Sequence, residues 1–325
     1  MILEQPSVRF EAIHSILSSD GNILTVSELC ETAGVSRSGY YRWLAAAGAR
    51  EKRETRDRED FELILEAYRH RGYQKGARSI YMSLLHRDPP VVMNVKKIRR
   101  LMDKYGLSCP IRKANPYRRM AKALRTSNVA DNLLKRAFRK YGPRMVLLTD
   151  ITYLPYNGIF AYLSTVLDAF TKQVLAYVTS PSLEVDFVLE TVDILIRDHG
   201  AELRTRTLLH SDQGCHYTSY SYIDILKDSS LRQSMSRKGN CWDNAPQESF
   251  FGHMKDEIDI SGCQAFDEVK AVIDDWMDYY NNERYQWQLA RLSPNEYYQY
   301  IQTGVYPLPV DNIPSIPEFE EPEDN

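Results

Sequence analysis

The pattern of apolar and polar positions changes character near Arg144. Three runs rich in β-branched and aromatic residues cover about residues 145–156, 160–170 and 173–180, and short turns join them. Such runs predict antiparallel neighbouring strands. Helical and strand patterns then alternate, with helices expected over 184–199, 220–227, 244–258 and 266–283 and strands over 207–212 and 231–236. This order predicts an α/β fold with a mixed sheet.

The first part of the chain is predicted to be helical, with a short helix and a helix-turn-helix between residues 8 and 46. Thr25 and Glu28 form a capping-box pattern, Gly34 lies at the tight turn, and Ser36 can cap the second helix. A recognition helix needs polar and basic groups near its N-terminus. The residues expected to contact DNA here are Arg37, Ser38, Tyr40 and Arg42. The alternative is an ordinary helical hairpin.

A second helical group is expected over about residues 58–106, after the charged connector EKRETRDRED. Its last helix, NVKKIRRLMDKYGL, has apolar side chains on one face, namely Val95, Ile98, Leu101 and Met102. Basic side chains remain on the other face, and these expected DNA contacts are Lys96, Lys97, Arg99 and Arg100. The pattern again indicates a helix-turn-helix with a basic reader helix.

The domain organisation follows from these patterns together with the local composition. The proline-rich and acidic C-terminal residues are expected to be disordered. The predicted parts are an N-terminal helix-turn-helix (1–50), a second helix-turn-helix-like domain (51–110), a basic linker (111–140), an α/β core (141–300) and an acidic disordered tail (301–325).

Charge is strongly segregated along the 325 residues, although the net charge is only -3. Residues 96–140 contain 15 Lys or Arg against two acids, whereas residues 311–325 contain six acids and no base. A basic run of this density suits a polyphosphate backbone, although a solvated helix face is the common alternative. The segregation favours a nucleic-acid partner.

Cysteine usage and the N-terminus bear on the compartment. The five cysteines are widely spread and never form a C-x-x-C pair, which argues against a disulfide framework or a structural zinc site. The chain has no run of about 18 apolar residues, and its start resembles no signal peptide. We therefore expect a cytoplasmic protein with no membrane partner.

Three acids stand out as candidate catalytic residues. Asp150 lies inside the first predicted strand, Asp212 ends the fourth, and Glu248 lies in the first turns of a helix. If strands one and four are neighbours, the carboxylates meet, and their repulsion requires cations. Oxygen-only ligation favours Mg²⁺ or Mn²⁺, and two such ions suit phosphodiester chemistry. Taken singly, each acid has an ordinary explanation as a turn residue or an exposed helix acid.

The blocks around these acids carry a family resemblance. TDITYL, HSDQGCHYTS and SMSRKGNCWDNAPQESFFGHMKDE resemble the catalytic core of retroviral-type integrases and, more closely, the second-frame product of bacterial insertion-sequence transposases of the IS-three class. The 35 residues between Asp212 and Glu248 match that group's spacing. AGVSRSGYYRWL, KKIRRLM and YYNNERYQWQLARLSPNEY extend the likeness over nearly the whole chain. Gln213 and the block 285–288 depart from the family pattern.

The resemblance implies a ribonuclease-H-like core and a DNA transposase using Asp150, Asp212 and Glu248 with two Mg²⁺ ions, for which Mn²⁺ can substitute. It further implies recognition of terminal inverted repeats, DNA cleavage, and attack of the freed 3′-hydroxyl on target DNA. A homo-oligomer on DNA and a first-frame companion protein are expected partners. The rival functions are a non-catalytic DNA-binding regulator and a nuclease that only hydrolyses.

Further residues near the three acids receive roles by the same resemblance. Lys255, two helical turns after Glu248, matches the basic residue that the family uses near the DNA end. Arg237 and Lys238 are candidates for phosphate contact, and Asn244 is expected either to orient a carboxylate or phosphate or to cap its helix.

Histidines and aromatic residues near the acids have competing roles. His210 and His216 are expected to be packed or hydrogen-bonded rather than metal ligands. Four aromatic residues are candidates for stacking on unpaired bases, although core packing is the favoured role of most: Tyr153, Tyr217, Trp242 and Trp287.

Overall fold

A computed structural model describes residues 5–110, 140–203, 206–229, 231–236 and 244–320. The chain divides into two compact units, Met1–Leu65 and Glu66–Asn325. Most of the predicted basic linker, together with Arg237, Lys238 and Trp242, lies outside the described residues.

The first unit is a small helical bundle of α1 (Pro6–Leu17), α2 (Val26–Thr32) and α3 (Arg37–Ala45). The predicted caps are confirmed: Thr25 and Glu28 form a capping box, and the Ser36 hydroxyl accepts a hydrogen bond from the Gly39 amide at 3.1 Å. Gly34 has a φ of 64°, as the tight turn requires.

Tyr40 corrects one prediction for the first unit. It was expected to face DNA, but its side chain is only 2% exposed and packs with Ile13, Leu29 and Cys30. Its ring points inward, where it also packs against the rings of Phe10 and Trp43. Tyr40 is therefore a structural residue of this bundle, whereas Arg37, Ser38 and Arg42 are exposed on the same helix.

The predicted connector between the helical groups is itself helical. α4 runs from Ala47 to Arg69 and passes through the expected boundary at residues 50 and 51. Its charged residues are good helix formers without proline, and Glu54 and Arg58 form an i, i+4 pair at 3.7 Å. The charged connector EKRETRDRED is therefore part of a continuous helix.

The second helical group contains α5 (Ala77–Leu85) and α6 (Val95–Lys104) after the short 3-10 helix η2 (His70–Gly72). Asn94 caps α6 by accepting from the Lys96 amide at 2.8 Å. The predicted faces of α6 are confirmed, because Ile98, Leu101 and Met102 are buried. On the opposite side, Lys96, Arg99 and Arg100 are exposed and Lys97 is half-buried.

The second helical group contacts the α/β core through a cluster of ion pairs. The Arg71 guanidinium lies 3.2 Å from Asp275 and 2.8 Å from Asp278, and it also pairs with Glu283. The Tyr73 hydroxyl donates to Asp275 at 2.7 Å. Both parts therefore belong to the second compact unit.

The core is a five-stranded mixed sheet with the order β3-β2-β1-β4-β5. β1 pairs antiparallel with β2, and β2 with β3, whereas β1–β4 and β4–β5 are parallel. This confirms the predicted hairpins and the central position of strand one beside strand four. The strands are β1 (Val146–Tyr156), β2 (Ile159–Asp168), β3 (Val174–Ser180), β4 (Leu208–Ser211) and β5 (Arg232–Met235).

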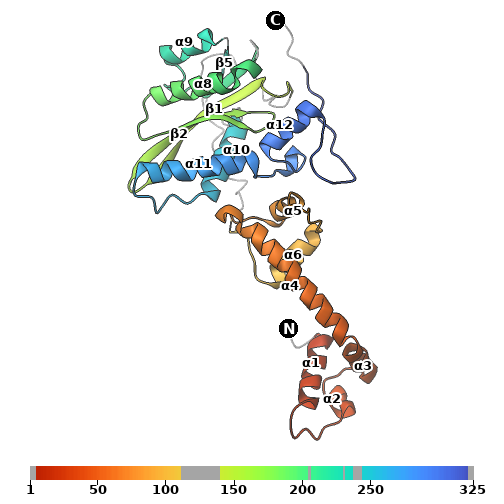
Figure 1. Cartoon of the computed structure of the whole chain (residues 1–325). Coiled ribbons are helices and arrows are strands. Elements are labelled where there is room, and N and C mark those ends of the chain that lie inside the picture. The colour runs from red at the N-terminus through yellow and green to blue at the C-terminus, as the bar shows by residue number, and fades with distance from the viewer. Residues whose placement is uncertain (1–4, 111–139, 204–205, 230, 237–243, 321–325) are drawn as a thin grey trace. The chain divides into compact units, whose positions relative to one another are not determined.

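Helices cover both faces of the sheet (Figure 1). Alternate residues of β1 face opposite layers: Leu147 packs in the cluster of α8 and α9, whereas Val146 and Leu148 pack in that of α10 and α11. No described helix has the length and apolar character needed to cross a bilayer. The remaining elements are α8 (Asp186–His199), η3 (Gly200–Glu202), α9 (Tyr220–Asp228), α10 (Ala245–Glu257), α11 (Phe266–Asn282), η5 (Trp287–Leu289) and α12 (Pro294–Thr303).

The C-terminal segment differs from the predicted disordered tail. Up to residue 320 it packs on the core: Leu308 is buried, the Tyr300 hydroxyl donates to the Pro314 carbonyl at 2.5 Å, and Phe319 meets Phe170 edge-on at 5.5 Å. The expectation was wrong here because scattered apolar side chains supply contacts that the acidic, proline-rich composition conceals.

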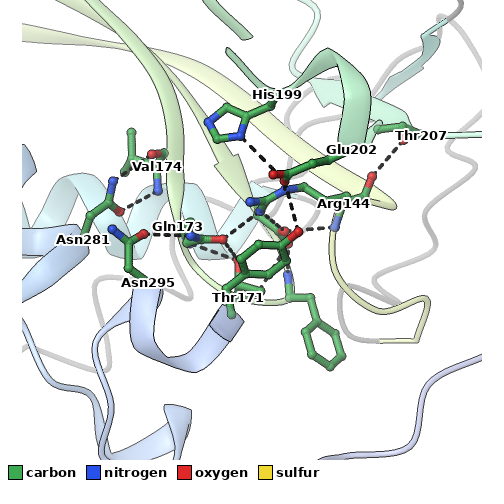
Figure 2. Close-up of polar contacts among 12 residues, drawn as sticks. Arg144, Thr171, Gln173, Val174, His199, Glu202, Thr207, Asn281 and Asn295 are labelled. Atoms are coloured by element: carbon green, nitrogen blue, oxygen red, sulfur yellow. Dashed lines mark hydrogen bonds and ion pairs between the residues drawn. The ribbon is translucent and has the colours of Figure 1, made fainter. Parts of the chain in front are cut away.

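A buried ion pair joins the start of β1 to the turn after β2 (Figure 2). The Arg144 side chain is 5% exposed, and one guanidinium nitrogen lies 3.0 Å from a carboxylate oxygen of Asp168, which is fully buried. The same guanidinium donates to Gln173 at 2.8 Å and to Glu202 at 2.7 Å. The Arg144 carbonyl accepts from Thr207 at 2.8 Å, just before β4. One residue thus ties β1, the β2–β3 turn and β4 together.

We predict that Asp168→Ala lowers the free energy of unfolding by about 3 kcal/mol, because it leaves the Arg144 guanidinium buried without its main partner. Urea unfolding followed by tryptophan fluorescence measures this change. The matched control is Asp198→Ala, which removes an exposed pair with Arg197 and is expected to cost less than about 1 kcal/mol. Equal effects of both variants would contradict the structural role of Asp168.

Candidate active site

Three carboxylates are positioned by three different elements. In the parallel pairing of β1 with β4, Leu148 lies opposite His210. Asp150 and Asp212 each follow two residues later, so the shared register brings them to the same end of the sheet. Glu248 lies in the first turn of α10, which packs on one face of that sheet.

The electrostatics of Asp150 show that the three acids share one environment. Asp150 is half-buried, and burial is the main cause that raises its pKa to about 7. The charge of Asp212 and, more weakly, that of Glu248 raise this pKa further. The backbone amide of Ile151, 2.8 Å from the carboxylate, and the ammonium of Lys255 oppose the rise. The charges of Asp212 and Glu248 therefore reach Asp150, as expected of acids that lie near one another.

Asn244 orients Asp150. Its side-chain Nδ2 donates to Asp150 Oδ2 at 3.2 Å, and its own Oδ1 is buried with no hydrogen-bond partner among the described residues. Asn244 occupies the N-cap position of α10, but its side chain makes no capping hydrogen bond. Of the two predicted roles, the structure favours carboxylate orientation, although the carboxylate is that of Asp150 rather than that of Glu248.

Asp212 lies just past β4 in a tight turn, where its Oδ1 accepts from the Gly214 amide at 2.8 Å. The neighbouring histidines are packed and hydrogen-bonded, as expected. His210 lies 3.0 Å from the Ser234 hydroxyl, and His216 lies 3.0 Å from the Leu183 carbonyl. Both imidazoles are buried.

The donor set was tested against the divalent cation that the resemblance implies. Within the described ranges, no three His, Cys, Asp or Glu side chains stand close enough to enclose one ion. The chemistry nevertheless fits a hard cation, because Asp150, Asp212 and Glu248 offer only oxygen. The raised pKa of Asp150 reports negative charge that a cation would neutralise. Residues of the right chemical type are therefore present and near one another, but their carboxylates do not surround a common point.

The expected DNA-contact residues divide between the site and other elements. Asn244 and Lys255 lie at the three acids, and Lys255 is exposed on α10. The exposed basic residues of α3 and α6 lie on helices that precede the α/β core. Tyr40 is excluded by its burial.

One buried residue near the acids was missed by sequence reasoning. Gln247 is fully buried, and its side-chain amide donates to the Thr165 hydroxyl. Thr165 lies on β2 opposite Asp150 in the β1–β2 register, so Gln247 fixes the start of α10 against the strand next to the one that carries Asp150. The only sequence signal was its place directly before Glu248.

We predict that Asp150→Asn stabilises the metal-free protein at pH 8. Because folding raises this pKa, the ionised carboxylate destabilises the folded state above pH 7, and the penalty fades as pH falls from about 7 toward 4. In EDTA, the variant's Tm should exceed that of the wild type by about 3 °C or more at pH 8, and by less at pH 5.5. Asp224→Asn, an exposed acid on α9, is the control. A gain that is absent or independent of pH would contradict the assignment.

Known proteins place these features in a family. Two families described as Integrase core domain match residues 140–241 and 229–294, and the HTH-like domain family matches residues 55–115. The putative transposase InsK of insertion sequence element IS150 from Escherichia coli K12 is 33% identical over 84% of this chain and 93% of its own length. A transposase-like protein from Haemophilus influenzae is 35% identical over 64% of this chain and 94% of its own.

Among solved structures, the HTLV-2 integrase catalytic core domain in complex with magnesium aligns with a TM-score of 0.38 and 13% identity, over 49% of this chain and 98% of that one. The mixed sheet with helices on both faces is the ribonuclease-H-like architecture of integrase cores. Similarity to InsK over most of both chains establishes the relationship. The chain belongs to the bacterial insertion-sequence transposases of the IS-three class, with an integrase core preceded by an HTH-like domain.

Proposed function

We propose that the chain is a DDE transposase that cleaves DNA at the ends of an insertion sequence and joins the freed ends to target DNA. The observation that carries this proposal is that Asp212, at the end of β4, and Glu248, on α10, both lie near enough to Asp150 on β1 for their charges to add to the rise that burial causes in its pKa. Three acids from three elements therefore face one region of the core. Family membership supplies the class of reaction.

In this proposal Asp150, Asp212 and Glu248 hold two Mg²⁺ ions, for which Mn²⁺ can substitute. Divalent ions held there would supply activation of a water or a 3′-hydroxyl and charge stabilisation of the leaving oxygen. Asn244 keeps the Asp150 carboxylate in one orientation through its 3.2 Å hydrogen bond. Lys255 presents an ammonium group to the DNA strand beside Asp150. No covalent protein intermediate is needed, because in-line displacement depends on positioning.

DNA recognition is assigned to the helical elements. Arg37 and Ser38 are exposed in the first turn of the capped helix α3, as major-groove reading requires, and Arg42 is exposed in its last turn. On α6 the basic face (Lys96, Lys97, Arg99 and Arg100) would contact the terminal inverted repeats or their phosphates. Arg237 and Lys238 are proposed phosphate contacts close in sequence to Glu248. We also propose a cytoplasmic location, because that is where the DNA substrate lies.

The chemistry requires two element ends to be held together, so we propose that the protein works as a homo-oligomer on double-stranded DNA carrying the terminal inverted repeats and on target DNA. A first-frame companion protein would assist end recognition. Mixing differently tagged copies on end DNA and recovering both tags in one complex would support the oligomer. Recovery of one tag only would argue against it.

We predict Mg²⁺-dependent cleavage and strand joining on DNA carrying the element ends, and a loss of at least about 1,000-fold in Glu248→Gln, because the variant cannot supply an anionic oxygen ligand. A denaturing gel resolves cleaved and joined strands. Glu190→Gln on α8, a helix on the other side of the sheet, serves as the matched control.

DNA binding is measured in the same samples with Ca²⁺ in place of Mg²⁺. Lys96→Ala should weaken binding and lower the salt dependence by about one ion, whereas Glu248→Gln should still bind. End binding without cleavage or joining, even with the companion present, would favour a regulator. Cleavage without joining when a 3′-hydroxyl end is supplied would favour a nuclease.

A further inference from the structure

A cavity of about 520 Å³ lies within the second unit, away from the three acids. Its walls come from the segment around the start of α5, from the end of α10 and from the segment after α11. This volume is in the range of small-ligand sites. The lining residues that matter here are Lys75, Arg78, His253, Arg284, Gln286 and Trp287.

Each acid in the cavity wall has a cationic partner. Glu257 is held by the Arg284 guanidinium through contacts of 2.6 and 3.0 Å, with both side chains largely buried. Glu283 pairs with Arg71, which it shares with Asp275 and Asp278, and it contacts the His70 imidazole. The repulsion that these carboxylates exert on an anionic ligand is therefore reduced.

Among the described residues, two cations in the wall, Lys75 and Arg78, contact carbonyl oxygens and an aromatic ring rather than carboxylates. Lys75 is 4% exposed, and its ammonium donates to the carbonyl oxygens of His70 at 2.8 Å and Tyr73 at 3.2 Å. Arg78 forms no ion pair with a carboxylate in the described part of the chain; its guanidinium lies 5.6 Å from the centre of the Trp287 ring. With Arg284, the wall has three cationic side chains against two acids, although burial lowers the pKa of Lys75 to about 8.

Trp287 gives the cavity a flat aromatic wall. Its side chain is 53% exposed, although tryptophan is costly to leave in water, and Tyr81 supports it at a centroid distance of 6.2 Å. The side-chain amide of Gln286 lies beside it in the chain and lines the same cavity. An exposed indole, a guanidinium and an amide are the groups that stack on a nucleobase and bind its edges.

The cavity lies along the helix that carries Glu248. His253 is five residues further on α10, which at the helical rise is roughly 7 Å along the axis. Five residues also turn the side chain by about 140° around the axis, so a DNA strand bound at Glu248 would have to pass around α10, over a few nucleotides, to reach the cavity.

We propose that this cavity binds one unpaired nucleotide of the DNA, with its base stacked on Trp287 and its phosphate beside Arg78. The proposal rests on the proposed function in that the strand bound at Glu248 supplies the nucleotide. Extruding a base costs a few kcal/mol of stacking and pairing. A base that is already unpaired should therefore bind more tightly than one in a complete duplex.

The test compares two short duplexes taken from the DNA flanking the gene, identical except for a single unpaired adenine near the end of one. Fluorescence anisotropy with the full chain in EDTA measures both affinities. The wild type should prefer the bulged duplex by about fivefold or more. Trp287→Ala and Arg78→Ala should remove most of this preference and keep the affinity for the paired duplex within about twofold.

Two control variants separate stacking from folding. Trp287→Phe should retain part of the preference, and Tyr220→Ala, which removes an 88% exposed aromatic ring on α9, should leave it unchanged. Equal affinity of the wild type for both duplexes, or an unchanged preference in Trp287→Ala, would overturn the proposal. Complete competition by free deoxyadenosine monophosphate at micromolar concentration would also overturn it, because the cavity would then be a site for free nucleotides.

Because the measurement requires neither metal nor cleavage, its outcome is separate from that of the strand-joining assay. A Trp287-dependent preference in a protein that never joins DNA would retain the cavity's role and reject the transposase chemistry. Joining activity without a preference for the bulged duplex would support the transposase chemistry and reject the cavity's role.

Discussion

The buried pair of Arg144 and Asp168 is the constraint on which the placement of the acids depends. It is formed where β1 begins and β2 ends, so it fixes the register of the two strands, with Thr165 opposite Asp150. Through the Arg144 carbonyl, the same residue holds the approach to β4 and therefore to Asp212. A buried charge tolerates only the arrangement that pairs it, which makes such a pair a strict determinant of geometry.

Further along β1, the same rigid sheet holds Asp150 where its negative charge is repelled by neighbouring acids. Burial and two neighbouring acids make the ionised form of Asp150 unfavourable, while the amide of Asn244 keeps its carboxylate in place. The folded state is thus less stable than it would be without the Asp150 charge, and in return carboxylate oxygens are concentrated around Asp150. Binding cations there would recover that free energy, and the bound cations would in turn attract the phosphates of DNA.

Much of the catalytic core was predictable because local patterns and burial agree there. The strand carrying Asp150, the end of β4 at Asp212 and the start of the helix carrying Glu248 were each predicted to within a few residues. The prediction failed where composition and packing diverge. Tyr40 is buried in a small bundle that needs its ring, and charged residues expected to form a linker continue α4. Long-range pairs between distant segments leave no periodic signal.

The central claim is that the three acids form one cation-binding centre, and anomalous diffraction from crystals soaked in MnCl₂ tests it most directly. The account predicts Mn²⁺ peaks bounded by the carboxylates of Asp150, Asp212 and Glu248, with Asn244 still hydrogen-bonded to Asp150, and no such peak in Asp150→Asn crystals. Manganese bound only elsewhere, or three carboxylates that remain apart with the ion in excess, would contradict it.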